Sequence, residues 1–575
     1  MNQRMGMGLM KLIYKRKGHK VDLKNYRPIT MLNTDLKILS KILANRLKEI
    51  MPSIIKTNQV YGVKGRDIAD TTISIKDMIR YINEKNKNGF LISLDFEKAF
   101  DRVEHDFLFG VLKSFGFGEN FIKWIRILYK GAVTKIKCNG FLTHVFKITR
   151  SIRQGCPLSA LLYSLISEPL GLAIKHEEGI KGIGVEGEEN KIFQYADDTT
   201  VMVKDLKSVK KAMEIVQMFC KGSGAKVNEE KTVYMRFGGA TDLTEHFTFK
   251  EMREIKILGV LMGRDEKKAE EIMWEELLGG IERRLNFWKL RTLTLKGKVL
   301  VLNVLMVSKL WYILYGSSMP MWAEKRLKKC FLDFLWKGKP ARIAYNTLIG
   351  AEGEGGLGLM DIEQRKNSLR VKIIKMYLDE ENKVEWKKTM EYFLSKCGNF
   401  NLGDNILWMR TKKWMTEGVP DFYKELMSAW GKFLTCVYFN PQGRENILNQ
   451  PLFLNNGILN QGKGIFYKKW WDVGITKVRD VLYEFKEGFL PIQYIVDVME
   501  EAKEDFTRQE LINKYDLIKK AIPEEWIQRI ENMEQTKQGW DIYVKMGENL
   551  YAFKECGVKR FYCFFRDIVF KKTCC

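Results

Sequence analysis

Histidine is scarce in this chain, and its few copies lie in the first half. The five histidines are at positions 19, 105, 144, 176 and 246, and none follows. A structural zinc site needs several cysteine or histidine ligands at short spacings. A mixed cysteine and histidine zinc site is therefore excluded from roughly the last three hundred residues.

Cysteine pairs at short spacing are also missing. Ten cysteines are scattered along the chain, and only Cys574 and Cys575 are neighbours. Cys138, Cys156 and Cys220 lie in apolar, core-like contexts. This usage is typical of free thiols in a reducing compartment. We therefore expect an intracellular protein, nuclear and cytoplasmic, that is not secreted.

Long uninterrupted apolar runs are absent as well. The start of the chain has no apolar segment of the kind that a signal peptide needs. The longest apolar stretch, 299–315, is interrupted by Asn303, Ser308 and Lys309, which indicates a buried helix and not a membrane span. The glycine-rich run at 353–359 lacks the Lys-Ser/Thr pair of a phosphate-binding P-loop, so we interpret it as a structural turn. We expect no membrane partner.

Positive charge, in contrast, is abundant. The formal net charge is +25 and the isoelectric point is near 9.4. Such an excess favours a polyanionic partner, most simply nucleic acid, although a merely soluble basic surface is the alternative. With 575 residues, 45% apolar and 12% aromatic, the chain is globular and too long for one core. Two to four domains are expected.

The pattern of apolar residues predicts an α+β fold. Two helices are expected first, at 35–51 and 67–83. Strands and helices then alternate in a mainly antiparallel sheet. The expected strands are 90–95, 133–138, 145–149, 192–196, 199–203 and 232–237, and the expected helices are 105–117, 119–130, 158–175 and 206–223. After about residue 265 the pattern is helical and basic.

A basic stretch with interleaved aromatic residues lies in this helical part. A solvated helix face over a buried core is one interpretation, and contact with nucleic acid is the other. The candidate nucleic-acid-binding residues are Arg283, Arg284, Lys289, Arg291, Lys296 and Lys298.

Two adjacent carboxylates, Asp197 and Asp198, are the most informative residues. Apolar, β-prone residues flank them on both sides, which predicts a strand, a tight turn and a second strand. Like charges side by side are costly without a cation, and a divalent metal removes that cost. Asp95 follows another predicted strand, so three acids on neighbouring strands could form a two-metal phosphoryl-transfer site.

Other segments occur in a fixed order around these acids. The run Arg-Gln-Gly-Cys-Pro-Leu-Ser at 153–159 precedes the acid pair, and 225–232 and 257–260 follow it. Each segment has an ordinary structural explanation by itself, such as an aspartate that caps a turn or a polar helix start with proline in its first turn. Their combination in this order is hard to obtain by chance.

The ordered set resembles the reverse transcriptase domain of non-LTR (LINE-type) retrotransposons. The runs at 23–30 and 58–66 are similar to the fingers of that family, and 153–159 separates it from retroviral enzymes. The segment 288–315 and the glycine-rich run resemble its thumb and post-thumb region. The resemblance implies a right-hand polymerase fold and RNA-directed DNA polymerase activity, a nucleotidyltransferase reaction.

The resemblance also implies roles for the metal ligands. Asp95, Asp197 and Asp198 would be the catalytic carboxylates, and the Phe96 carbonyl would be a further ligand. Two Mg²⁺ ions, with Mn²⁺ as the alternative, suit these oxygen donors. The ions would activate a primer 3′-hydroxyl and stabilise the leaving pyrophosphate.

Six further residues would bind the incoming nucleotide. Arg27 and Lys15 would clamp its triphosphate, and Phe100 would exclude a ribose 2′-hydroxyl. Gln154 would contact the nucleotide, with Gly155 allowing close approach of the backbone.

Lys231 would be the sixth, as a general acid for pyrophosphate. The ordinary alternative for this residue is an exposed loop lysine, and for Phe100 it is a core aromatic.

The expected domains are fingers at 1–89, palm at 90–265 with interleaved fingers segments, thumb at 266–345, and a mainly helical C-terminal region at 346–575 of unassigned role. An endonuclease usually precedes the polymerase in complete elements, so we expect an N-terminally truncated copy. The expected partners are an RNA template, a DNA primer or nicked target DNA, and dNTPs. Two alternatives remain: a catalytically silent nucleic-acid-binding remnant, and an RNA-dependent RNA polymerase.

Overall fold

The chain divides into two compact units. The structure is a computed structural model that describes residues 6–16, 18–398, 402–483, 488–531, 539–546 and 548–574. The first unit contains residues 1–272 together with the short segment 383–388, and the second contains 273–382 and 389–575. The predicted boundaries between fingers and palm, and between thumb and C-terminal region, fall inside these units and stay predictions.

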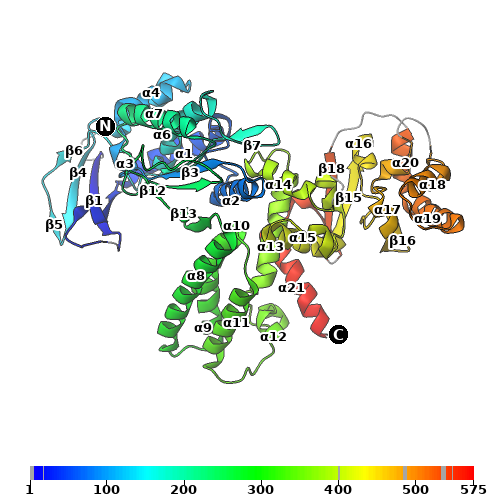
Figure 1. The fold of residues 1–575 in the computed structure, drawn as a ribbon. Coiled ribbons are helices and arrows are strands. Elements are labelled where there is room, and N and C mark those ends of the chain that lie inside the picture. Colours follow the sequence, from blue (N-terminus) through cyan, green and yellow to red (C-terminus); the bar gives the residue numbers. More distant parts are fainter. Residues whose placement is uncertain are drawn as a thin grey trace. The chain divides into compact units, whose positions relative to one another are not determined.

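A five-stranded sheet forms the centre of the first unit, in the order β12-β11-β3-β10-β9 (Figure 1). Its strands are β3 (Gly89–Leu94), β9 (Ile192–Tyr195), β10 (Asp198–Val203), β11 (Val233–Phe237) and β12 (Lys250–Glu251). β3 pairs antiparallel with both β10 and β11. The sequence predicted four of these strands to within one or two residues, because each has a β-prone apolar core bounded by turn residues.

Helices from the same region cover this sheet, as Figure 1 shows for α4, α6 and α7. Their amphipathic faces close over the apolar residues of β3, β10 and β11, including Ile92, Val201 and Tyr234. The helices of the first unit are α1 (Thr34–Ile54), α2 (Ile68–Glu84), α3 (Ala99–Arg102), α4 (His105–Ser114), α5 (Glu119–Tyr129), α6 (Ser159–His176) and α7 (Leu206–Ser223).

A second sheet in this unit was only partly predicted. Its strands are β1 (Met7–Tyr14), β2 (Tyr26–Met31), β4 (Val133–Cys138), β5 (Phe141–Leu142) and β6 (Phe146–Lys147). β1 pairs antiparallel with β2 and parallel with β4. The sequence predicted no strand where β1 and β2 lie, because two half-exposed strands give no clear alternation. Small hairpins complete the unit: β7 (Ile183–Val185) with β8 (Glu188–Asn190), and β13 (Glu254–Ile257) with β14 (Val260–Gly263).

The second unit is mostly helical, as predicted, and begins within α8 (Glu266–Lys289). Its other helices are α9 (Leu295–Val301), α10 (Leu310–Gly316), α11 (Met321–Trp336), α12 (Tyr345–Ile349), α13 (Ile362–Leu378), α14 (Trp386–Ser395), whose first residues belong to the first unit, α15 (Asp421–Phe433), α16 (Arg444–Leu448), α17 (Lys468–Asp472), α18 (Ile492–Glu501), α19 (Arg508–Ala521), α20 (Glu524–Glu531) and α21 (Val558–Cys574).

The C-terminal part also contains strands that the sequence did not predict. β15 (Val437–Gln442), β18 (Gly539–Met546) and β19 (Asn549–Ala552) form an antiparallel sheet, and β16 (Leu459–Asn460) pairs with β17 (Lys463–Gly464). About a hundred residues separate β15 from β18, so no local pattern announces their pairing.

Among the described residues, one helical run is long and apolar enough to cross a membrane by its length and composition alone. This run, Leu295–Gly316, is 56% buried inside the protein over its most apolar window. It consists of α9, a π-helical turn at Leu302–Met306, a 3-10 turn at Val307–Lys309, and α10. The core helices of soluble proteins pass the same test, and the burial agrees with the predicted buried helix.

Candidate active site

Asp197 and Asp198 lie at the tip of the hairpin that joins β9 and β10. Asp198 pairs with Tyr195 across this hairpin, and Ala196 and Asp197 form its two-residue turn. On the other side of β10, Thr199 pairs with Leu94 of β3. One further step along this antiparallel ladder places Asp198 opposite Asp95, the residue that follows β3. The strand register therefore brings the three predicted carboxylates to one end of the sheet.

The three acids interact electrostatically. Burial and the negative charge of Asp95 raise the pKa of Asp197, while its own backbone amide and Arg27 lower it. Partial burial and then the charges of Asp197 and Asp95 raise the pKa of Asp198 to about 6. The Asp198 side chain still reaches solvent at the hairpin tip, so water weakens this effect. The shared repulsion is the cost that a divalent cation would remove.

The donor set fits a hard cation, but its present geometry is open. Lys231 Nζ lies 3.9 Å from Asp95 Oδ2 and compensates part of the charge. Among the residues that the structure describes, no three acidic, histidine or cysteine side chains converge on one point. Carboxylate oxygens are the ligands that Mg²⁺ prefers, so the chemistry of the three acids fits such an ion.

The backbone around Phe96 is anchored without using the Phe96 carbonyl. Phe96 forms an isolated antiparallel bridge with Val227. The two hydrogen bonds of the bridge run from Asn228 N to the Asp95 carbonyl, at 2.7 Å, and from Glu97 N to the Lys226 carbonyl, at 2.8 Å. The predicted ligand role of the Phe96 carbonyl therefore stays compatible with this bridge.

A cluster of cations faces the acids. Arg27 lies on β2 and is close enough to Asp197 to lower its pKa. Lys15 follows β1, and burial and then the charges of Arg27, Lys231 and Lys98 lower the pKa of its amine. Because lysines and arginines that lie close together repel one another, binding of a polyphosphate anion between them is favourable. The fold thus brings the two predicted triphosphate ligands, Lys15 and Arg27, to the same site as Lys231.

Gln154 and Gly155 lie against the β2 strand. The Gln154 carbonyl accepts a hydrogen bond of 2.8 Å from Thr30 N. Gly155 has a φ of +110°, and a β-carbon there would lie 2.6 Å from the Thr30 carbonyl oxygen. Any other residue would therefore push the two segments apart. The Gln154 side chain donates a hydrogen bond of 3.3 Å to Asp101 Oδ1.

Phe100 is half-buried beside the acids and stacks on Tyr163 of α6. Their ring centroids are 4.3 Å apart and the rings are inclined by 19°. Tyr163 is buried, and burial is the main cause that raises the pKa of its hydroxyl. The negative charges of Asp197 and Asp198 raise this pKa further. Phe100 is therefore both part of the packed core and a neighbour of the acids, so the two interpretations of this residue are compatible.

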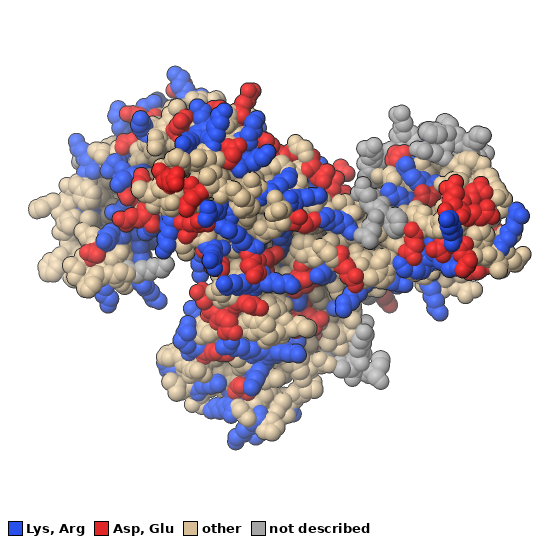
Figure 2. Space-filling model, viewed as in Figure 1, with Lys and Arg blue, Asp and Glu red and all other residues tan. Residues whose placement is uncertain are grey.

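The predicted nucleic-acid-binding residues lie in the second unit. Arg283, Arg284 and Lys289 on α8 are exposed, as are Arg291 and Lys296. Lys298 instead donates a hydrogen bond of 2.5 Å to the Leu335 carbonyl, and partial burial lowers the pKa of its amine. Figure 2 shows lysine and arginine dispersed among acidic residues on the visible face, without a single basic patch.

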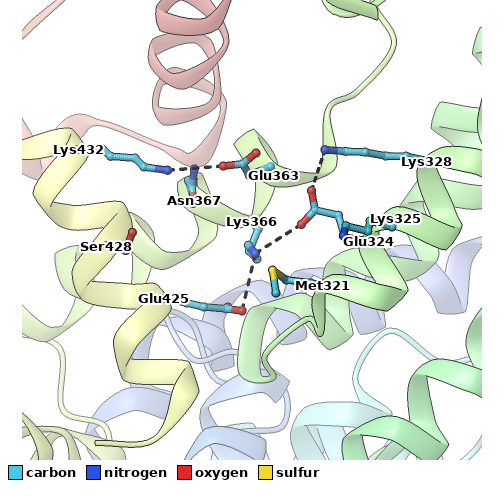
Figure 3. A pocket seen from close by; sticks show the side chains of 10 residues that line it. All are labelled: Met321, Glu324, Lys325, Lys328, Glu363, Lys366, Asn367, Glu425, Ser428 and Lys432. Carbon is cyan, nitrogen blue, oxygen red and sulfur yellow. Dashed lines mark ion pairs between the residues drawn. The ribbon is translucent and has the colours of Figure 1, made fainter. Parts of the chain in front are cut away.

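The second unit also contains a pocket of about 390 Å³, shown in Figure 3. Lys366 lies within it between Glu324, at 3.9 Å, and Glu425, at 3.7 Å. The lysine and glutamate charges that line the pocket therefore largely compensate one another. None of the predicted site residues lines this pocket.

Four residues near the site were not predicted as functional. Asp101 holds Gln154, and Tyr163 holds Phe100. Gln59 contacts the hairpin turn, and Arg153 is 4% exposed with no hydrogen-bond partner for its guanidinium among the described residues. Arg153 lies inside the recognised run 153–159 and Asp101 lies six residues after Asp95, which could have indicated them. Gln59 lies inside the recognised run 58–66, which could also have indicated it, whereas Tyr163 gives no sequence signal because its contact with Phe100 joins two distant segments.

Comparisons with known proteins identify a family and several relatives. Residues 14–262 match the family described as "Reverse transcriptase (RNA-dependent DNA polymerase)". The chain is 29% identical over 450 residues to a Transposon TX1 149 kDa protein of Xenopus laevis, covering 76% of this chain and 34% of that protein. It is 25% identical over 209 residues to a Pol polyprotein of the retrotransposable element R2DM of Drosophila melanogaster, covering 36% of this chain and 19% of that protein.

Two further comparisons extend the set. An RNA-directed DNA polymerase from the mobile element jockey of Drosophila melanogaster is 24% identical over 243 residues, which are 40% of this chain and 25% of that protein. A structure of apo telomerase from Candida tropicalis aligns with a TM-score of 0.36 and 14% identity, over 58% of this chain and 59% of that one. A TM-score this low supports no conclusion about the fold or the function of this chain.

The chain spans about a third of the length of the Xenopus relative and a fifth of the R2DM protein. The family match covers the strands and loops that bring Lys15, Arg27, Asp95, Gln154 and the Asp197–Asp198 pair together. The match to this family supports the right-hand polymerase fold that the sequence predicted. Residues 14–262 are therefore a reverse transcriptase domain, and the relatives that the chain resembles are proteins of non-LTR (LINE-type) retrotransposons.

Proposed function

We propose that this chain is an RNA-directed DNA polymerase that extends a DNA 3′-hydroxyl on an RNA template with dNTPs. The observation that carries the proposal is the ladder register that sets Asp198 opposite Asp95, with Asp197 in the adjoining turn. This arrangement supports a metal-dependent nucleotidyl transfer. The family match and the relatives' names support the same reaction class.

The acids would hold two Mg²⁺ ions, or Mn²⁺, with the Phe96 carbonyl as a further oxygen ligand. When bound, the ions supply the Lewis acidity that lowers the pKa of the primer hydroxyl and neutralises the leaving pyrophosphate. Arg27 and Lys15 bind and orient the triphosphate. Lys231, which is exposed with its Nζ 3.9 Å from Asp95 Oδ2, would give a proton to the pyrophosphate.

Phe100 and Gln154 would shape the nucleotide pocket. The Phe100 ring, which stacks on Tyr163, would exclude a ribose 2′-hydroxyl. The Gln154 amide, held by Asp101, would contact the incoming nucleotide. The exposed basic residues of α8 would contact the nucleic-acid backbone without reading its sequence.

Primer extension on poly(rA)/oligo(dT) with Mg²⁺ tests the proposal. The full chain should extend the primer, and Asp197→Asn should reduce the rate by roughly a hundredfold to a thousandfold or more, since charge stabilisation at the reacting centre is lost. Asp106→Asn is the matched control, because Asp106 is exposed on α4. Equal extension by the full chain and Asp197→Asn would reject the assignment.

One observation favours the catalytically silent alternative. Among the described residues the acids do not converge on a single point, and Asp95 faces Lys231. Template binding without extension, insensitive to Asp95→Ala, would support that alternative. Incorporation of ribonucleotides as fast as deoxynucleotides would instead support an RNA-dependent RNA polymerase.

A further inference from the structure

The hairpin turn that carries Asp197 has a strained backbone. Ala196 adopts a φ of +56°, which a residue other than glycine rarely does. Such a conformation costs about 1–3 kcal/mol and persists only where the surroundings hold it. Ala196 is only 5% exposed, so bulk water does not reach its backbone amide. Something inside the protein must therefore bind this amide.

The side chain of Gln59 binds it. Ala196 N donates a hydrogen bond of 3.2 Å to Gln59 Oε1, which also accepts 3.0 Å from Tyr61 N. Gln59 Nε2 donates 2.9 Å to Ser167 Oγ on α6. Gln59 is fully buried, so both ends of its amide are engaged by the protein.

The backbone of Gln59 is fixed as firmly as its side chain. Gln59 forms a parallel bridge with Gln194 of β9. Gln194 N donates 2.7 Å to the Asn58 carbonyl, and Val60 N donates 3.2 Å to the Gln194 carbonyl. The segment 58–60 therefore extends the central sheet by one short strand, just beside the hairpin.

Close packing by α6 prevents this strand from shifting. Asn58 Nδ2 donates 3.0 Å to Gln194 Oε1. A β-carbon at Gly171 would lie 2.4 Å from Gln194 Oε1 and 2.7 Å from Asn58 Nδ2. The glycine thus lets the helix lie directly on the pair of amides.

We propose that Gln59 is a positioning residue for the reaction, which acts by holding Ala196 in its left-handed conformation and thereby sets the direction of Asp197 and Asp198. This inference rests on the proposed function, because it assigns Gln59 a part in orienting those carboxylates. The backbone amide that Gln59 binds belongs to Ala196, the residue immediately before Asp197. Small errors in the placement of reacting groups can reduce a rate by about a hundredfold.

The test compares Gln59→Leu with Gln194→Leu in the full chain. Both residues are fully buried in the same amide network, but only Gln59 bonds to Ala196. Amide hydrogen exchange of the peptide covering 192–201 should be roughly tenfold faster in Gln59→Leu, since one backbone hydrogen bond is lost. The affinity for Mn²⁺, measured by calorimetry with primer and template present, should also fall roughly tenfold.

Activity provides a separate readout. Gln59→Leu should lower kcat roughly tenfold to a hundredfold with little change in KM for dNTP, because the nucleotide ligands are untouched. Gln59→Glu should recover part of the loss, since its carboxyl oxygen still accepts from Ala196 N. Gln194→Leu keeps the bond between Gln59 and Ala196, so it should lower Mn²⁺ affinity and kcat less than Gln59→Leu does.

The outcomes separate the two proposals. Wild-type exchange and Mn²⁺ affinity in Gln59→Leu, or an equal loss in Gln194→Leu, would overturn the role of Gln59. A wild-type chain that binds Mn²⁺ but extends no primer would overturn the polymerase function, while weaker Mn²⁺ binding by Gln59→Leu would still support positioning. If Gln59→Leu does not fold, Ser167→Ala removes the anchor of the Gln59 amide, and wild-type behaviour of that variant would overturn the proposal.

Discussion

The indole nitrogen of Trp386 donates a hydrogen bond of 3.0 Å to Asp70, across 316 residues of sequence. Both side chains are buried. Asp70 also accepts from Asp67 N at 2.8 Å, in the capping box that begins α2. Segment 383–388 thus belongs to the first unit, although the residues on both sides of it cluster with the second unit.

Replacing Trp386 by phenylalanine should destabilise the protein by about 2 kcal/mol, since the hydrogen bond to a buried carboxylate is lost. The melting temperature measured by calorimetry should fall by several degrees. Trp124→Phe is the matched control, because Trp124 is 46% exposed on α5 and should change stability by less than about 0.5 kcal/mol. Equal melting temperatures for the two variants would show that segment 383–388 is not anchored in this way.

Phe100→Ala should relax discrimination against ribonucleotides. Removing the ring opens space next to the acids, and one pocket contact of this kind changes selectivity by roughly 10- to 200-fold. Tyr163→Leu should give a smaller change in the same direction, because Phe100 loses the ring on which it stacks. The measurement is the ratio of kcat/KM for dNTP and rNTP.

Phe117→Ala is the control for this pair. Phe117 stacks on Phe121 at a centroid distance of 5.1 Å, and neither was predicted in the nucleotide site. An unchanged ratio in Phe100→Ala would remove the gate assignment.

Glu168 should make the protein less stable as the pH rises. Burial raises the pKa of this carboxyl to about 7, above its ordinary value of 4.5, and the bond from Lys56 N only partly opposes this. The folded state therefore binds more protons than the unfolded state between pH 4.5 and 7, so stability is lost as pH increases through that window.

Glu168→Gln should consequently raise the free energy of unfolding by about 1–3 kcal/mol at pH 8 and have little effect at pH 4. Gln can still accept from Lys56 N. Denaturant melts at the two pH values measure the effect, with Glu178→Gln as the exposed control. A Glu168→Gln variant that is less stable than wild type at pH 8 would contradict the assignment.

Arg153 should be replaceable with a gain in stability. Its guanidinium is buried without a hydrogen-bond partner among the described residues, and burial lowers its pKa. A buried unpaired charge is costly, so Arg153→Met should raise the free energy of unfolding by up to about 3 kcal/mol. Arg102→Met should have the opposite sign, since Arg102 Nε donates 3.0 Å to the Gly224 carbonyl. A loss of stability in Arg153→Met, seen in urea melts, would contradict this.

Local pattern was sufficient for the elements that carry the acids. The strands β3, β9 and β10 and the helices α6 and α7 begin and end within about two residues of their predicted bounds. Each has a regular apolar period and clear turn residues, which are properties of short sequence windows. The strand-turn-strand prediction around Asp197 and Asp198 is confirmed by the β9–β10 hairpin.

Pairing between distant segments was not predictable in the same way. β1 was missed, and its parallel partner β4 was assigned to the sheet of the predicted palm. The C-terminal sheet of β15, β18 and β19 was also missed. Hydrogen bonds between strands far apart in sequence depend on which edges the folded chain brings together, and no local pattern records that choice.

By itself, the sequence determined the chemistry of the site: three carboxylates, the lysines and arginines that compensate them, and the family that they resemble. Only the tertiary structure decided how these groups are held. The ladder places Asp198 opposite Asp95, Tyr163 braces Phe100, and Gln59 holds Ala196. Side-chain identity is a local property of the chain, whereas the partner of a buried amide or ring is chosen by packing among segments more than sixty residues apart.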